Sequence, residues 1–397
     1  MDDCGIIQGV YDALPEDFTY DQLVDFGDKL LIPAMNDMHV HAPQFANMGV
    51  AMDMQLLPWL NTYVFPEEAK FADEAYAETI YHSFVSELWR QGTMRAAVFA
   101  TVHTPATHIL ARTFDEAGMG AWIGLVGMDR HAPANLCNTS AEWEAGIQTL
   151  TDALASMPLV KPIITPRFIP SCTPEMLRCM GEVAKQTLLP VQSHLSENKQ
   201  EIAWVKELEP ESLCYGDAYY RYGLFGQTPT LMAHCCYTDG EELKLMREQN
   251  VYAVHCPTSN CNLASGIAPV RKLLQQGVNV ALGSDIAGGH HLSMFRVMQY
   301  AVQMSKLQYT ASDGKYPFLT LSEVFHMATK IGGSLFGKVG SFEKGYAFDA
   351  LVIDDLCLSP HHLTTLSPIQ RLERFVYLGD DRQIQHRFCQ GNEIKQV

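Results

Sequence analysis

The sequence has few positive charges and no basic cluster. Its 397 residues include 28 Lys and Arg against 45 Asp and Glu, which gives a formal net charge of −17. Phosphate binding needs a stripe of Lys and Arg, so this composition argues against nucleic acid as a partner. A free, neutral nucleobase remains compatible with it, because a nucleobase carries no phosphate.

The sequence also lacks long apolar runs. None approaches the length of a membrane-spanning helix, and the first residues, MDDCGIIQGVYD, are acidic and lack the apolar stretch of a signal peptide. The 11 cysteines are odd in number and lack the regular spacing of a disulfide scaffold. We therefore expect a cytoplasmic protein with reduced thiols and no membrane partner.

No internal repeat and no Pro-rich linker divides the chain, and 47% of its residues are hydrophobic, enough for one large core. Short apolar or β-branched runs alternate with amphipathic helical stretches, and eight such alternations predict an α/β fold, a parallel (β/α)8 TIM-type barrel. The expected strands are Leu31–Val40, Met94–Thr101, Ala121–Gly127, Val160–Phe168, Pro190–His194, Thr230–His234, Val251–Cys256 and Val278–Asp285. The expected helices between them include Glu67–Gln91, Pro174–Gln186, Asp239–Gln249 and Ala268–Gln276.

A small β-unit is expected outside the barrel. Ser341–Asp354 and Arg374–Gln396 contain strand-like pieces, the latter around FVYLGDDRQIQHRFCQGNEI. We expect three parts: residues 1–33 as a short N-terminal segment of the β-unit, 34–345 as the catalytic barrel, and 346–397 as the C-terminal part of the β-unit.

Polar residues gather where the expected strands end. These residues are His39 and His41, Arg167 and Phe168, His194, His234, and Asp285, on strands one, four, five, six and eight. The C-terminal ends of the strands in a (β/α)8 barrel converge on one mouth, where active sites are built. This convergence predicts the site better than any single motif does.

His39 and His41 are the first candidate metal ligands. Residues i and i+2 of a strand face the same side, and imidazole suits a divalent metal such as zinc. With His194 and Asp285 they form a set that leaves a position for water, as catalytic rather than structural sites do. Asp285 could instead cap the next helix, but its place after a strand favours a role in a site where a metal activates water.

Two further residues are candidates for moving protons and charge. Glu197 follows His194 by three residues, where a carboxylate can take a proton from water and pass it to a leaving amine. His234 could be a ligand, a cation that stabilises charge on the substrate, or a structural histidine. For His255 we favour a supporting role, and Asn260 could make a polar contact. An H-E-x-x-H helix and the P-C-x-x-C signature are both absent, which argues against zincin proteases and cytidine-deaminase-type folds.

The ordered motifs HVH, SHLSEN, MAHCCY, HCPTSN and GSDIAGG resemble those of the amidohydrolase superfamily. Further segments are similar to its guanine deaminase family. They are HAPQ at 41–44, LLPWL at 56–60, YVFPE at 63–67, FATVHT at 99–104, KPIITPRF at 161–168 and FVYLGDD at 375–381. The resemblance extends from about residue 31 to the C-terminus.

This resemblance implies hydrolytic deamination of guanine to xanthine and ammonia by a metal-activated water. It implies one Zn²⁺ per subunit, with iron as an alternative, held by His39, His41, His194 and Asp285. It further implies that Glu197, His234 and Asp285 are catalytic, and that the purine contacts Gln44, Arg167, Phe168, His234 and Glu197. Family members are typically dimeric, so a homodimer is expected.

The sequence departs from the family pattern at Pro33–Asp37, at Thr258 and in its N-terminal part. Only 38 residues precede His39, so we expect an incomplete small β-unit with an exposed sheet edge that a partner subunit could cover. Two alternatives stay open: a deaminase of another aminopurine, a pterin or a triazine, and a non-catalytic scaffold. The pocket around Gln44 and Arg167 discriminates among substrates, and the complete ligand set with Glu197 argues against a scaffold.

Overall fold

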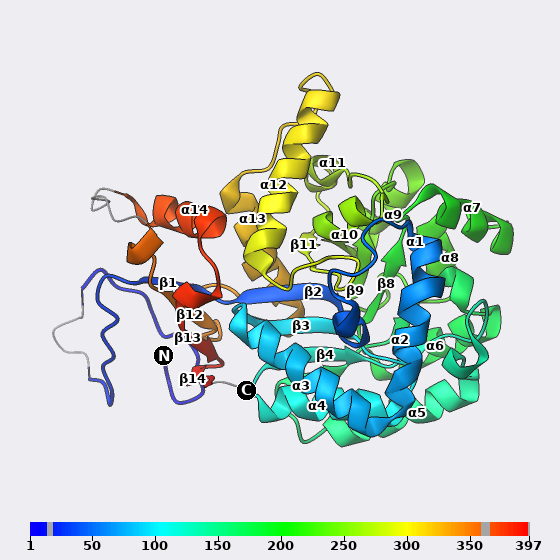
Figure 1. The fold of residues 1–397 in the computed structure, drawn as a ribbon, viewed down its shortest axis with the longest axis horizontal. Coiled ribbons are helices and arrows are strands. Elements are labelled where there is room, and N and C mark those ends of the chain that lie inside the picture. The colour runs from blue at the N-terminus through cyan, green and yellow to red at the C-terminus, as the bar shows by residue number, and fades with distance from the viewer. Residues whose placement is uncertain (14–18, 359–365, 396–397) are drawn as a thin grey trace.

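The computed structural model describes residues 1–13, 19–358 and 366–395, and within these ranges parallel strands follow one another in chain order around a barrel (Figure 1). They are β2 (Met35–His41), β3 (Thr93–Phe99), β4 (Gly120–Gly124), β6 (Val160–Pro162) with β7 (Thr165–Pro166), β8 (Val191–Leu195), β9 (Thr230–His234), β10 (Tyr252–His255) and β11 (Val280–Leu282). Each predicted barrel strand overlaps one of them.

Backbone hydrogen bonds connect these strands into a ring. Strands β2, β3, β4 and β6 form one parallel sheet, β8, β9, β10 and β11 form another, and β5 (Val126–Gly127) pairs with β7. The amide of Ile164 donates to the carbonyl of Pro190 at 2.9 Å and connects the two sheets. The amide of Asp285 donates to the carbonyl of His39 at 2.9 Å, which connects strand eight with strand one. The predicted (β/α)8 barrel is confirmed.

Helices cover the outside of the strands. They include α3 (Glu74–Arg90), α4 (Thr104–Glu116), α5 (Ser140–Leu154), α6 (Pro174–Thr187), α7 (Lys199–Leu208), α9 (Gly240–Glu248), α11 (Val270–Gln275) and α12 (Met294–Ala311). The predicted helix Glu67–Gln91 is not continuous, because Asp73 is extended and caps α3 by accepting a hydrogen bond from the amide of Ala75. No helix in the described ranges combines the length and apolarity that crossing a membrane requires.

The segment before Asp73 forms one side of the mouth. It comprises α1 (Leu56–Trp59), a π-helical turn (Leu60–Val64), α2 (Phe65–Glu68) and a 3₁₀ turn (Ala69–Ala72). The amide of Phe65 bonds to the carbonyl of Leu60, five residues back, and π turns of this kind are frequent at functional sites.

A small antiparallel sheet lies beside the barrel, and the N-terminus lies near it (Figure 1). Its order is β1 (Leu30–Pro33), β12 (Ala350–Ile353), β13 (Ile384–Cys389) and β14 (Asn392–Glu393). The predicted single strand Leu31–Val40 is therefore wrong, because the chain passes from this sheet into the barrel at Ala34. A buried ion pair connects the barrel with the small sheet: Nε of Arg95, in β3, lies 2.5 Å from Oδ2 of Asp349, which directly precedes β12.

The predicted strand around Phe375 is a helix, α14 (Pro368–Leu378). Ser367 and Gln370 form a capping box at its start, and Leu372, Phe375 and Val376 bury one face at helical spacing. Gln396, the end of the predicted range, lies outside the described residues, as do residues 14–18, 359–365 and 397 of the three expected parts.

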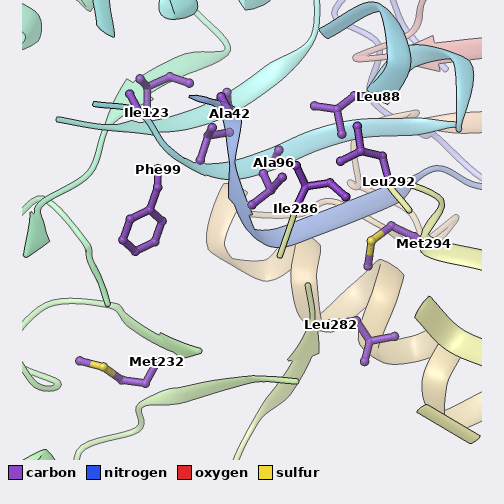
Figure 2. Close-up of a cluster of buried hydrophobic side chains, with 14 of the residues drawn as sticks. Ala42, Leu88, Ala96, Phe99, Ile123, Met232, Leu282, Ile286, Leu292 and Met294 are labelled. Atoms are coloured by element: carbon purple, nitrogen blue, oxygen red, sulfur yellow. The ribbon is translucent and has the colours of Figure 1, made fainter. Parts of the chain in front are cut away.

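The apolar core extends up to the mouth. Figure 2 shows Phe99, Ala96 and Leu282 among the buried side chains of the strands. The ring centre of Phe99 lies 4.5 Å from that of His41 and 5.0 Å from those of His39 and His194. Full burial of such a ring stabilises the fold by about 1.5–3 kcal/mol. The core therefore packs against three imidazoles and restricts their rotation.

All eleven cysteines are free, as expected.

Candidate active site

Three imidazoles and one carboxylate meet at the mouth of the barrel. Nε2 of His39 and Nε2 of His41 lie 3.2 and 3.5 Å from Oδ1 of Asp285. Nε2 of His41 lies 3.1 Å from Nε2 of His194. The four residues come from β2, β8 and the turn after β11, so the structure brings together the whole predicted ligand set.

The hydrogen bonds of this cluster leave nitrogen atoms free for an ion. Nε2 of His39 is buried and has no hydrogen-bond partner, since its approach to Asp285 is not aligned for one. Nδ1 of His194 lies 2.6 Å from the carbonyl oxygen of Arg167. A carbonyl only accepts, so Nδ1 carries the proton and Nε2 keeps a lone pair directed at the cluster.

The protonation states also suit a metal. Burial lowers the pKa of His39, His41 and His194, which keeps these imidazoles neutral, the state that binds metal ions. Burial opposes ionisation of Asp285, but the contact with His39 and the charge of His234 outweigh it and hold its pKa well below the usual range. Neutral imidazoles and one carboxylate are a donor set that fits a divalent transition metal.

His234 differs from these three histidines. Burial alone would lower its pKa, but the charges of Glu197 and Asp285 raise it above the usual value. Its Nδ1 lies 2.8 Å from Oδ1 of Asn260, and its Nε2 lies 3.6 Å from Oε2 of Glu197. These contacts favour a protonated ring with its Nε2 proton directed at the cavity, although His234 is also close enough to His39 and His194 to share an ion with them. Two of the predicted alternatives, a ligand and a cation, thus remain open.

Glu197 lies at the start of the segment after β8, with its carboxylate next to the cluster. The hydroxyl of Ser265 donates to its Oε1 at 2.6 Å, and burial raises its pKa. A raised pKa means that this carboxyl group keeps its proton at a higher pH than a free one, which suits a group that accepts and releases a proton.

A cavity with about 430 Å³ of empty space, part of it open solvent, joins these groups to a second set of residues. All predicted site residues except His39, which is part of the cluster beneath, line this cavity: His41, Gln44, Arg167, Phe168, His194, Glu197, His234 and Asp285. Gln44 comes from a 3₁₀ turn after β2, and Arg167 and Phe168 follow β7. Apolar side chains also line the cavity, from Leu56, Trp59, Leu60 and Leu263.

Sequence analysis missed two buried carboxylates at this cavity. Glu68 of α2 contacts both Arg167 and Gln44 from behind. Glu201 lines the cavity, accepts a hydrogen bond from the hydroxyl of Tyr215 at 2.8 Å, and has its pKa raised to about 7 by burial and by the neighbouring Glu197. The only signal in the sequence for these two carboxylates is that each lies within an apolar segment. For Glu201 the sequence also has a structural explanation, because it forms a helix-capping box with Asn198.

Known proteins resemble this chain in sequence and in structure. The profile of the amidohydrolase family matches residues 30–394. A guanine deaminase from Dictyostelium discoideum is 40% identical over 387 residues, which cover 94% of this chain and 84% of that protein. The crystal structure of a guanine deaminase from C. acetobutylicum, with guanine bound in its active site, is 49% identical with a TM-score of 0.96, covering 99% and 93% of the two chains. The structure of an adenosine deaminase from Xanthomonas campestris with bound zinc is 25% identical with a TM-score of 0.81, covering 92% and 80%.

Proposed function

Because this chain belongs to the amidohydrolase family and, within it, to the guanine deaminases, we propose that it converts guanine and water into xanthine and ammonia. One observation carries the proposal. A single cavity joins the cluster of imidazoles and carboxylates, which can activate water, to Gln44, Arg167 and Phe168, which can hold a planar base. A non-catalytic scaffold would have no need of Glu197 beside an intact ligand set.

The residues His39, His41, His194 and Asp285 would hold the metal, which we propose to be one Zn²⁺ per subunit, with iron also compatible with these donors. The bound zinc of the X. campestris relative supports this choice. When bound, the metal supplies a Lewis acid that lowers the pKa of water and makes it a nucleophile at neutral pH.

The protein's own residues would bind and orient the base. Arg167 and Gln44 offer directional donors and one acceptor to the edge of a purine. Phe168 offers an apolar face for stacking. Together they would place the amino-bearing carbon, C2, towards Glu197 and His234, which line the same cavity.

Glu197 would then move the protons. It takes one proton from the attacking water as the oxygen bonds to C2, and it passes this proton to the ring nitrogen whose double bond to C2 opens. The hydroxyl proton of the adduct next moves to the amino nitrogen, the C2–N bond breaks, and ammonia leaves as the C2 carbonyl forms. His234 donates from Nε2 to the oxygen that gains charge, and Asp285 helps to orient the water.

The test is an assay of ammonia and xanthine with guanine as the substrate. We expect turnover that a strong chelator abolishes and that added Zn²⁺ restores. Adenine, a pterin and an aminotriazine in the same assay test the alternatives, because the same ligand set would serve their deamination. Turnover of one of these at a higher kcat/KM than guanine would replace the proposal.

Three further predictions concern the domains, the oligomeric state and the location of the protein. We propose residues 1–33 and 346–397 as the small β-unit and 34–345 as the catalytic barrel. We also propose a homodimer, which sedimentation of the metal-loaded protein would test. A cytoplasmic location stays a prediction.

A further inference from the structure

Glu68 lies behind the end of the cavity that holds Gln44 and Arg167. It comes from α2, is 2% exposed, and is not among the residues that line the cavity. Its Oε2 lies 2.5 Å from Nη1 of Arg167, and its Oε1 accepts a hydrogen bond from Nε2 of Gln44 at 3.2 Å. One carboxylate therefore contacts both polar side chains that would recognise the purine.

These contacts fix the orientation of Gln44. The amide of Ala287 donates to Oε1 of Gln44 at 3.1 Å, while Nε2 donates to Glu68. A donor on one side and a carboxylate on the other allow only one orientation of the side-chain amide. The second Nε2 proton and the second lone pair of Oε1 remain for a ligand.

Glu68 also determines the charge at this end of the cavity. Arg167 is 3% exposed, its guanidinium lies over the ring of Phe65 with 5.3 Å between them, and it makes no other ion pair within the described ranges. A buried guanidinium without a counter-ion would attract any anion that entered the cavity. With Glu68 opposite, the pair is neutral overall but still presents N–H donors.

We propose that Glu68 is a positioning residue that acts through Gln44 and Arg167, and that it makes this end of the site select neutral purines over anionic ones. The inference rests on the proposed function and adds a specificity to it. Such selection would matter for turnover, because xanthine, the product, is a stronger acid than guanine and its anion would otherwise be retained by Arg167.

The experiment compares the binding of two purines to the metal-loaded protein by calorimetry near neutral pH. Urate is an anion there, and hypoxanthine is neutral. We expect Glu68→Gln to strengthen urate binding relative to hypoxanthine binding by about tenfold, because the variant leaves the charge of Arg167 uncompensated. The ratio of the two Kd values cancels a general loss of packing, which would weaken both ligands alike. An unchanged ratio in folded Glu68→Gln protein would overturn the proposal.

The neighbouring Glu67 supplies the matched control. It is also buried, but it contacts Lys70 and Tyr76 instead of the cavity. Glu67→Gln makes the same chemical change one residue away, and we expect it to leave the ratio as in the wild type. A shift in Glu67→Gln equal to that in Glu68→Gln would assign the effect to overall charge and contradict the proposal.

Arg167→Gln gives a prediction of opposite sign that does not depend on the folding of the first variant. It leaves Glu68 as an uncompensated anion, so urate binding should weaken more than hypoxanthine binding. Equal weakening would contradict the proposal. Ammonia release from guanine by the wild type is measured in parallel, so a failure of the proposed function is distinguished from a failure of this selectivity.

Discussion

The buried carboxylates at the two ends of the cavity have different surroundings. At one end, Glu197 and Glu201 face histidines, hydroxyls and backbone amides, and no Lys or Arg in the described part of the chain pairs with either. At the other end, Glu68 is paired with Arg167 and holds Gln44. The first arrangement raises pKa values and allows protons to move, and the second fixes charge and geometry. Under the proposed function, the end with Glu197 would react with the purine and the end with Glu68 would recognise it.

The largest expected effect is a loss of turnover when Glu197 is replaced. Glu197→Gln keeps the shape of the side chain but removes its ability to carry a proton, so we expect kcat for guanine to fall by about 10³-fold or more with little change in KM. Steady-state kinetics measures this. Glu207→Gln, an exposed position on the adjacent helix, is the control. A loss in Glu197→Gln smaller than tenfold would show that another group moves the proton.

A second effect concerns stability and pH. The pKa of Glu201 is raised from 4.5 to about 7, chiefly by burial, so the folded protein binds this proton more tightly than the unfolded chain. The resulting stabilisation is complete below pH 4.5 and is lost as pH rises through 7. Glu201→Gln cannot lose a proton, so its stability relative to the wild type should rise by about 2 kcal/mol between acidic and alkaline pH.

Urea unfolding at pH 5 and pH 8 and equal metal loading measures this difference. Glu207→Gln, at an exposed position on the same helix, is the control variant. Parallel pH dependence of the wild type and Glu201→Gln would contradict a raised pKa of Glu201.

The smallest expected effect lies at the recognition end. Gln44→Ala removes one donor and one acceptor from the cavity, and we expect kcat/KM for guanine to fall by about tenfold, mainly through KM. Melting temperature serves as the control for folding. A fall in kcat comparable with that of Glu197→Gln would mean that Gln44 acts on the reacting atoms, and the division into two ends would not hold.

The sequence was sufficient to predict that the residues of the ligand cluster come together, because they lie near the ends of strands. Once a parallel barrel is predicted, the ends of its strands must meet, and His39, His194 and Asp285 each lie within a few residues of such an end. The bond between Asp285 and His39 across the closing pair of strands is the contact that this reasoning required.

The recognition end was predicted only in part. Arg167 and Glu68 are 99 positions apart, one just after a strand and the other in a helix, so no periodicity relates them. The break at Asp73 and the change of sheet at Ala34 escaped prediction for a related reason, because apolar patterning continues through both positions. Helix α14 was missed because its aromatic and β-branched residues suit a strand equally well, and only the cap at Ser367 decides between the two.

The most direct test of this account is a crystal structure of the protein with zinc and xanthine, measured at the zinc absorption edge. The account predicts one anomalous peak among His39, His41, His194 and Asp285, with C2 of the purine beside it and the far edge of the base on Gln44 and Arg167. A peak at other residues, or a purine turned so that Arg167 and Gln44 do not touch it, would contradict the division of the cavity into a reacting and a recognising end.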